Sequence, residues 1–408
     1  MVLVLILSLF IPISLPQARA LTPPEIDAAS AQTPRHVEPI IKLLAGNRLR
    51  GRDNNTPESL LTQRFLVAFL KKLGSGLDST RSGDDAFMQP FVESTQSGTN
   101  ILALIPGREL PDEYVIVGAH YDHLGTRSRP DGICSARGTV GGRTCNGATD
   151  NAAGVAATLA IGEALRSLPT PPRRSVVLAL WDCEEDGLLG SLHYVKNPLV
   201  PLKQTVAYVN FDILGQDLVP SLRSNTFAVS SETGGTFLQG VVDRAAAGQD
   251  FDLRKVSYIF GESRSDYKNF VDKHVPTIFF SDSTGPCYHT TGDDLSIVNF
   301  TKLRAQTKTA FRTVVELAES ETVPTFVPRN QQGAVYADAV SLLPVYTAAQ
   351  ADLALFTPAD RASLQTFALH TQQIVDRGAS RFGAGDAFTL LGDVTLAIDI
   401  LTRSGCKK

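Results

Sequence analysis

The sequence has no excess of positive charge. Among its 408 residues, 38 are Lys or Arg and 42 are Asp or Glu, which gives a formal net charge of -4. Nucleic-acid-binding domains usually concentrate Lys and Arg on one face, and this composition offers no such footprint. We therefore expect no nucleic-acid partner.

Long apolar runs are absent after the first twenty residues. The opening stretch, MVLVLILSLFIPISLPQARA, is interrupted by Pro12 and Pro16 and ends in an A-x-A pattern at Ala18–Ala20. A membrane anchor is the alternative, but the run is short for a span, so we predict a signal peptide over residues 1–20. Cleavage after about Ala20 would export the protein to the periplasm or the exterior and leave no membrane span.

Cysteines are few and odd in number. The chain has five, so at least one stays unpaired in an exported protein. Cys134 and Cys145 flank a glycine-rich loop, and their spacing is compatible with a disulfide or with two free thiols. The spacing fits no CxxC zinc site.

Apolar strands alternate with helical patterns through most of the chain. This alternation predicts an α/β fold, in which helices flank both faces of a mostly parallel central sheet. Strands are expected at 100–107, 113–121, 175–182, 204–212, 226–231 and 275–282, and helices at 35–49, 57–74, 151–168, 187–197, 234–248, 265–274 and 299–320. The Pro-containing stretch 321–335 predicts a linker between a main domain, 21–325, and a helical C-terminal extension, 326–408.

Polar side chains follow several of the predicted strands. Because ligands bind at the carboxyl ends of parallel strands, we expect these side chains to meet at one edge of the sheet. Asp150 could instead be the N-cap of the helix that follows it. The candidates are His120, Asp122, Asp150, Glu184, Glu185, Asp212 and His289. Their nitrogen and carboxylate ligands suit Zn²⁺ or a similar divalent ion.

Five motifs in a fixed order carry a resemblance to a known family. The stretches GAHYDHLG, NGATDNAAG, EEDGLLGS, VNFDILG and CYHTTGDD resemble the M28 family of dizinc peptidases. The helical lead-in from about Leu43 is also similar, and the similarity runs to about Glu319. The C-terminal segment lies outside it.

The resemblance implies a role for each candidate. Two Zn²⁺ would bind per chain, with Asp150 bridging them. His120 and Asp212 would complete one zinc site, and Glu185 and His289 the other. Asp122 would support the site from behind His120. Glu184 would be the general base that moves a proton from the attacking water to the leaving amine.

Three further expectations follow from the resemblance. Tyr288 would steady the tetrahedral oxyanion, and Arg264 would bind substrate. The Asp150–Asn151 peptide bond would be cis. The sequence departs from some secreted members because no second cysteine lies shortly after His289, which leaves the partner of Cys287 open.

These residues favour an exported metallo-aminopeptidase that removes N-terminal residues from peptides. A dipeptidase or carboxypeptidase of the same fold is an alternative, because Arg264 could meet a carboxylate as well as a carbonyl. A glutaminyl cyclase-like enzyme with one zinc is another, and an inactive relative acting as a binding module is a third. Tyr258, Phe260 and Phe280 are candidates for lining the pocket of the substrate side chain, and ordinary packing in the core is the alternative for each.

Overall fold

The computed structural model describes residues 19–128, 132–136 and 142–406. The signal peptide predicted over 1–20 therefore lies almost wholly outside the described residues. The helices are α1 (Pro23–Ser30), α2 (Pro34–Leu44), α3 (Pro57–Leu70), α4 (Ala153–Arg166), α5 (Leu189–Lys196), α6 (Gly235–Ala246), α7 (Tyr267–Val271), α8 (Phe300–Glu319), α9 (Tyr336–Ala349), α10 (Pro358–Arg377) and α11 (Ala384–Arg403). The strands are β1 (Ser75–Gly76), β2 (Met88–Glu93), β3 (Gln96–Ile105), β4 (Leu110–His120), β5 (Arg174–Trp181), β6 (Thr205–Phe211), β7 (Asn225–Val229), β8 (Asp252–Val256) and β9 (Thr277–Ser281).

The strands form one mixed sheet with a parallel centre. Its order is β1-β3-β5-β4-β6-β9-β7-β8, and β2 pairs with β3 at the edge. The four central strands β5, β4, β6 and β9 run parallel, whereas β3 and β7 join them in antiparallel pairing. The carboxyl ends of the four central strands therefore open on the same edge of the sheet.

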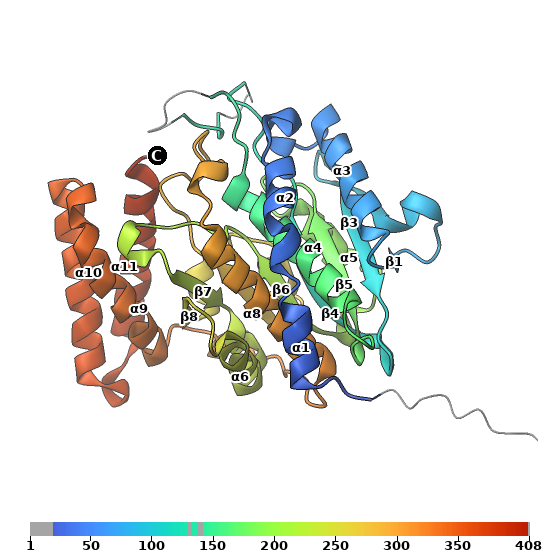
Figure 1. The fold of residues 1–408 in the computed structure, drawn as a ribbon. Helices are drawn as coiled ribbons and strands as arrows, with labels where there is room; N and C mark the ends of the chain where they lie inside the picture. Colours follow the sequence, from blue (N-terminus) through green and yellow to red (C-terminus); the bar gives the residue numbers. More distant parts are fainter. Residues whose placement is uncertain (1–18, 129–131, 137–141, 407–408) are drawn as a thin grey trace, which may run out of the picture.

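Both faces of the sheet are covered by helices (Figure 1). In β4, Val115 and Val117 pack into one apolar cluster, and Tyr114 and Ile116 pack into another on the opposite face. Helices α1–α4, α6 and α8 contribute to the first cluster, and α5, α7 and α9–α11 contribute to the second. This two-sided burial explains why the central strands read as continuous apolar runs.

The C-terminal helices lie beside the β8 edge of the sheet (Figure 1). Residues 320–335 connect them to α8 and contain only the short 3₁₀ turn Arg329–Gln331. Helix α9 packs on β8, and buried Asp338 accepts hydrogen bonds from Ser257 N and Oγ at 2.7 and 2.8 Å. The extension thus shares one apolar cluster with the sheet.

The structure contains two disulfides. Cys134 bonds Cys145, and Cys287 bonds Cys406 near the end of the chain. Cys183 is buried and free, in agreement with the expected unpaired cysteine. None of the helices in the described ranges combines the length and apolar character needed to cross a membrane.

The α/β prediction is confirmed, and the differences are local. Strands β1, β2 and β8 were not expected, because short and edge strands carry a weak sequence signal. β1 has only two residues, β2 contains Pro90, and β8 has the charged sequence DLRKV. The helix expected over 265–274 is limited to Tyr267–Val271. It ends early because His274 adopts a φ of 61° and Pro276 follows.

Candidate active site

The polar residues predicted at strand ends do converge on one edge of the sheet. His120 is the last residue of β4, Glu184 and Glu185 follow β5, Asp212 follows β6, and His289 lies in the loop after β9. His120 Nε2 lies 3.3 Å from Asp212 Oδ1, and His289 Nε2 lies 3.0 Å from Glu185 Oε2. The parallel direction of the strands is what brings these side chains together.

Asp150 lies between the two histidines. Its Oδ1 is 3.2 Å from His120 Nε2, and its Oδ2 is 3.4 Å from His289 Nε2. It precedes α4 in a π-helical turn, Ala148–Ala152, and its bond to Asn151 is cis, as expected. The N-cap alternative is wrong, because it is Asn151 Oδ1 that accepts the hydrogen bond from Gly154 N.

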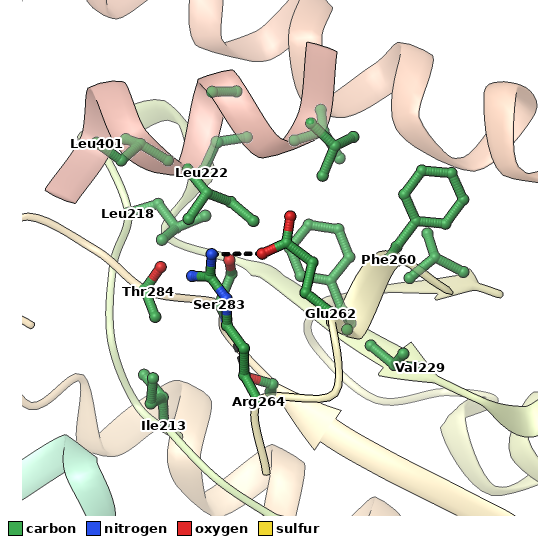
Figure 2. A pocket seen from close by; sticks show the side chains of 18 of the residues that line it. Ile213, Leu218, Leu222, Val229, Phe260, Glu262, Arg264, Ser283, Thr284 and Leu401 are labelled. Atoms are coloured by element: carbon green, nitrogen blue, oxygen red, sulfur yellow. Dashed lines mark hydrogen bonds and ion pairs between the residues drawn. The ribbon is translucent and has the colours of Figure 1, made fainter. Parts of the chain in front are cut away.

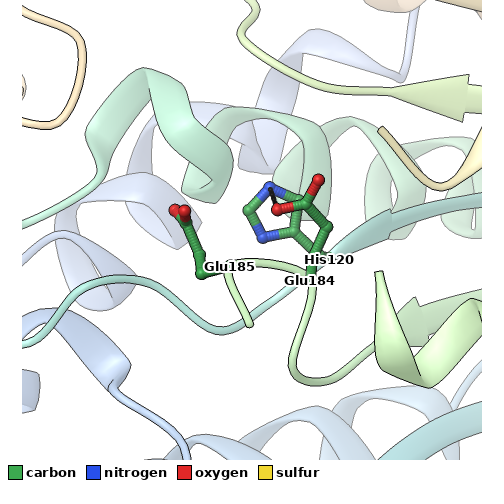
Figure 3. A group of neighbouring side chains, drawn as sticks. All are labelled: His120, Glu184 and Glu185. Atoms are coloured by element: carbon green, nitrogen blue, oxygen red, sulfur yellow. Dashed lines mark ion pairs between the residues drawn. The ribbon is translucent and has the colours of Figure 1, made fainter. Parts of the chain in front are cut away.

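The two adjacent glutamates point to different partners. Cys183 turns the chain with a φ of 54°, and Figure 3 shows the side chains of Glu184 and Glu185 leaving that turn in different directions. Glu184 Oε2 lies 3.9 Å from His120 Nε2, whereas Glu185 contacts His289 and accepts from His123 Nδ1 at 2.6 Å. The two glutamates can therefore perform different tasks in the same polar cluster.

Asp122 fixes the backbone of that turn. Its Oδ1 accepts from Glu184 N at 3.1 Å, and its Oδ2 accepts from Glu185 N at 3.2 Å. Its main-chain oxygen lies 3.1 Å from His120 Nδ1. One buried aspartate thus orients a histidine and both glutamates.

Electrostatics also separates the two glutamates. Burial raises the pKa of Glu184 well above its usual value, and the neighbouring carboxylates of Asp212 and Glu185 raise it further. Burial also opposes ionisation of Glu185, but His289 and His123 outweigh it and lower its pKa to about 2. Glu185 is therefore held as a carboxylate, whereas Glu184 has reason to bind a proton.

His123 belongs to the site, although the sequence argument gave it no role. It is fully buried, and it forms a possible metal-holding group with Asp150 and Glu185. Its Nε2 has no hydrogen-bond partner among the described residues. The available signal was its position in GAHYDHLG, one residue after Asp122.

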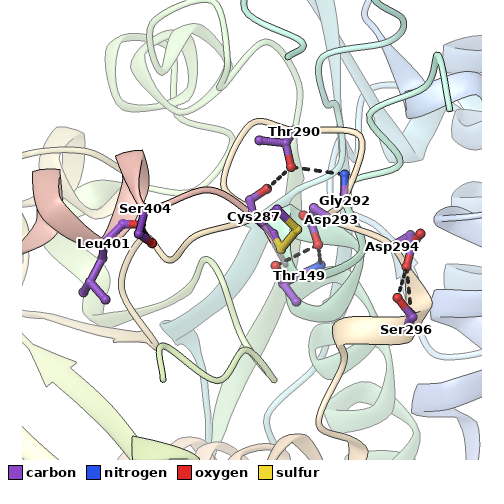
Figure 4. Close-up of a disulfide and its surroundings, with 10 residues drawn as sticks. Thr149, Cys287, Thr290, Gly292, Asp293, Asp294, Ser296, Leu401 and Ser404 are labelled. Carbon is purple, nitrogen blue, oxygen red and sulfur yellow. Dashed lines mark hydrogen bonds between the residues drawn. A yellow bond between two sulfur atoms is a disulfide. The ribbon is translucent and has the colours of Figure 1, made fainter. Parts of the chain in front are cut away.

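Asp293 and Arg52 support the site from behind and were also missed. Asp293 accepts hydrogen bonds from Thr149 N and Oγ1 at 2.9 Å (Figure 4). It also accepts one from Asp150 N at 3.0 Å. Fully buried Arg52 donates to four carbonyl oxygens, those of Leu44, Tyr121, Asn146 and Gly147, at 2.7–3.0 Å. Burial lowers the Arg52 pKa to about 10, while Asp293, Asp150, Asp122 and Glu185 raise it.

Tyr288 and Arg264 line a pocket that begins at the polar cluster. Figure 2 shows the part of this pocket around Arg264. The Tyr288 ring stacks on His289 with centroids 3.7 Å apart. Arg264 forms an ion pair with Glu262. Of the three aromatic residues expected around the substrate side chain, only Phe260 lines this pocket. Phe280 packs in the core against Phe211, and Tyr258 packs against Tyr267.

The cluster has the composition of a divalent-metal site. Its side chains form three overlapping groups that could each hold an ion: His120 with Glu184 and Glu185, His120 with Asp150 and Asp212, and His123 with Asp150 and Glu185. Buried carboxylates need a cationic partner, and neutral imidazoles with carboxylates are ligands that zinc accepts. The residues present therefore fit the zinc that the sequence predicted.

Known proteins resemble the chain in sequence and in fold. Mouse "Aminopeptidase NAALADL1" is 34% identical over 123 residues, which cover 29% of this chain and 14% of that protein. The zinc aminopeptidase BSAP of Bacillus subtilis shares the fold with a TM-score of 0.53 and 15% identity, over 72% of this chain and 98% of that one. The glutaminyl cyclase of Porphyromonas gingivalis also shares it, with a TM-score of 0.50 and 18% identity over 71% and 98%.

The sequence model of Peptidase family M28 matches residues 100–314, slightly more than half of the chain. The match includes every residue of the polar cluster from His120 to His289. The chain therefore belongs to peptidase family M28.

Proposed function

We propose that the protein is a zinc-dependent exopeptidase that removes N-terminal residues from peptides. One observation carries the proposal: two histidines and three carboxylates surround one space, and a sixth side chain, Glu184, faces it with a raised pKa. A metal-dependent hydrolase needs metal ligands and, beside them, a carboxylate that can take up a proton.

The proposed ligands divide into two sets. His120 and Asp212 would hold one Zn²⁺, Glu185 and His289 would hold a second, and Asp150 would bridge the two. The position of Asp150 between the two histidines supports the bridging role. When bound, zinc lowers the pKa of a water molecule towards about 7 and polarises the carbonyl of the scissile bond.

The remaining residues would carry the proton and position the reacting groups. Glu184 accepts the proton of the attacking water and passes it to the leaving amine, while Asp122 fixes the turn that presents it. Tyr288, stacked on His289 beside the carboxylates, donates a hydrogen bond from its hydroxyl group to the developing oxyanion. Arg264 contacts the substrate further into the pocket.

Export is proposed together with this activity. The two disulfides support it, because disulfides persist in oxidising compartments. The predicted signal peptide, residues 1–20, would direct the chain there. Mass spectrometry of the protein secreted by an expressing bacterium tests this, and a mature N-terminus near Leu21 is the expected result.

A matched pair of substrates tests the reaction. The zinc-loaded protein should hydrolyse alanine p-nitroanilide, and it should leave N-acetylalanine p-nitroanilide intact because a free N-terminus is required. Chelation should abolish hydrolysis, and zinc should restore it. Equal cleavage of both compounds, or release of C-terminal residues from peptides, would contradict an aminopeptidase. Conversion of an N-terminal glutamine to pyroglutamate would favour the cyclase alternative instead.

A further inference from the structure

The pocket beside the polar cluster has a wall that the family match does not cover. The cavity measures about 150 Å³ and begins at Asp150, Glu184 and Asp212. From there it extends between apolar residues of the main fold, such as Leu218, Leu222 and Val229, and the C-terminal helices (Figure 2). Helices α9 and α11 supply Leu342, Tyr346, Val394, Ala397 and Leu401.

The interior of the pocket is apolar, and its charges are paired. Apart from the three carboxylates at its catalytic end, Glu262 and Arg264 are the only charged side chains among the described residues that line it. These two form an ion pair, and Glu262 also accepts a hydrogen bond from Thr395 of α11. A charged side chain entering this space would lose water without gaining a free counter-charge.

The size of the pocket selects among apolar groups. A cavity of about 150 Å³ lined by Leu, Ile and Phe accommodates benzene in another protein, and this pocket has a similar volume and lining. It therefore suits a phenyl or isobutyl group. A methyl group would leave most of the cavity unfilled, which forgoes much of the favourable contact.

The C-terminal wall is fastened to the catalytic loop. The disulfide between Cys287 and Cys406 joins the end of α11 to the residue next to Tyr288, with Cα atoms 4.4 Å apart (Figure 4). At its other end, the extension is held by Asp338, which accepts two hydrogen bonds from Ser257. Both anchors keep α9 and α11 over the pocket.

From this arrangement we infer that the C-terminal helices are part of the substrate site: α9 and α11 close a pocket that holds a large apolar side chain of the residue being removed. The inference rests on the proposed peptidase function and adds its specificity. It also makes residues 326–408 a component of the catalytic unit.

Two substitutions in neighbouring positions of α11 test the inference. Ala397 is half-buried in the pocket wall, so Ala397→Trp should fill the cavity. Leu396 is 54% exposed and does not line the pocket, so Leu396→Trp is the matched control. The readout is the ratio of kcat/KM for phenylalanine p-nitroanilide to that for alanine p-nitroanilide.

We expect the wild type to favour the phenylalanine substrate. Ala397→Trp should lower the ratio by about 10–200-fold, the range by which apolar pockets discriminate. Leu396→Trp should leave it unchanged. Val394→Trp, from the same wall, provides a second test if Ala397→Trp does not fold. A folded wall variant that keeps the wild-type ratio would overturn the inference.

Binding of free L-phenylalanine, measured by calorimetry on the zinc-loaded protein, separates this inference from the proposed function. If the wild type hydrolyses neither anilide, the proposed function fails. In that case, if the wild type binds phenylalanine and Ala397→Trp does not, the result would still support the inferred pocket. Hydrolysis of both anilides with no preference, and no difference between wild type and Ala397→Trp, would leave the peptidase standing and refute the pocket.

Discussion

The two ends of the pocket differ in chemistry, and the C-terminal helices contribute to only one of them. At one end, His120, Asp150 and Asp212 lie at strand ends within the segment that matches the M28 family. At the other, Leu342 and Leu401 come from helices beyond that segment. In the proposed function, the sheet edge carries out the reaction. In our inference, the C-terminal helices and apolar residues of the matched segment together determine which substrate side chain binds.

The largest expected effect is on turnover, and it comes from a substitution at the polar end of the pocket. Glu184→Gln should lower kcat by about 10²–10⁴-fold, because it removes the proposed general base, and it should retain zinc. The neighbouring change Glu185→Gln should instead lose zinc, since that side chain contacts His289 and His123. Elemental analysis and anilide kinetics distinguish the two variants. Unchanged turnover in Glu184→Gln would exclude it as the base.

Substitution of Arg52 tests how much the stability of the polar end depends on the N-terminal helical segment. Arg52→Met removes the side-chain donor of four buried carbonyl oxygens, of which only Gly147 O keeps another donor among the described residues, Ala152 N. It also removes a buried positive charge near four carboxylates. We expect a loss of about 3–5 kcal/mol in the free energy of unfolding, measured by urea denaturation. Arg52→Lys should recover part of it. Equal stability of wild type and Arg52→Met would contradict this supporting role.

The disulfide that joins the two ends gives the next prediction. Cys406→Ser should lower the free energy of unfolding by about 2–4 kcal/mol, because the unfolded chain loses a cross-link between residues 287 and 406. It should also lower the preference for phenylalanine over alanine anilide by loosening α11. Ser404→Ala, two residues away, is the control. If Cys406→Ser equals the wild type in both stability and substrate preference, the disulfide is not needed to hold α11 over the pocket.

The smallest expected effect is on the pH dependence of stability, and it comes from a buried carboxylate that lines neither end of the pocket. Burial raises the pKa of Glu232 to about 7, although its Oε1 accepts a hydrogen bond from Tyr258 N. Because the folded state holds this proton more tightly than the unfolded state, the contribution of Glu232 to stability is present below about pH 4.5 and is lost as pH rises through about 7. This lost contribution to the free energy of unfolding is about 3 kcal/mol at most.

Glu232→Gln isolates this contribution. The difference in unfolding free energy between variant and wild type, followed by urea denaturation from pH 4 to 8, should change in favour of the variant as pH rises. A difference that stays constant over this range would mean that Glu232 does not titrate there.

The sequence predicts the polar end well because each candidate occupies a recognisable local motif. His120 and Asp212 end or follow apolar strands, and parallel strands bring such positions to one edge. The second layer is harder to predict. Asp293 lies in the motif CYHTTGDD, but its hydrogen bonds to the turn before α4 form only in the tertiary fold. Arg52 lies in a polar, turn-rich stretch, and nothing in the local sequence indicates that it is buried.

The apolar end could not be read from the sequence for a different reason. Leu342, Ala397 and Leu401 have the same helical spacing whether they face a core, a neighbouring helix or a cavity. The pairing of Cys287 with Cys406 was likewise open, because cysteine spacing does not determine connectivity. Only the packing of α9–α11 on the β8 edge assigns these residues to the pocket.

The most direct test of the account is anomalous diffraction from zinc-loaded crystals, collected above and below the zinc absorption edge. We predict two zinc peaks per chain with Asp150 between them, Glu185 bound to one of them, and Glu184 bound to neither. A single zinc peak, or a Glu184 carboxylate that ligates the metal in place of Glu185, would contradict the account.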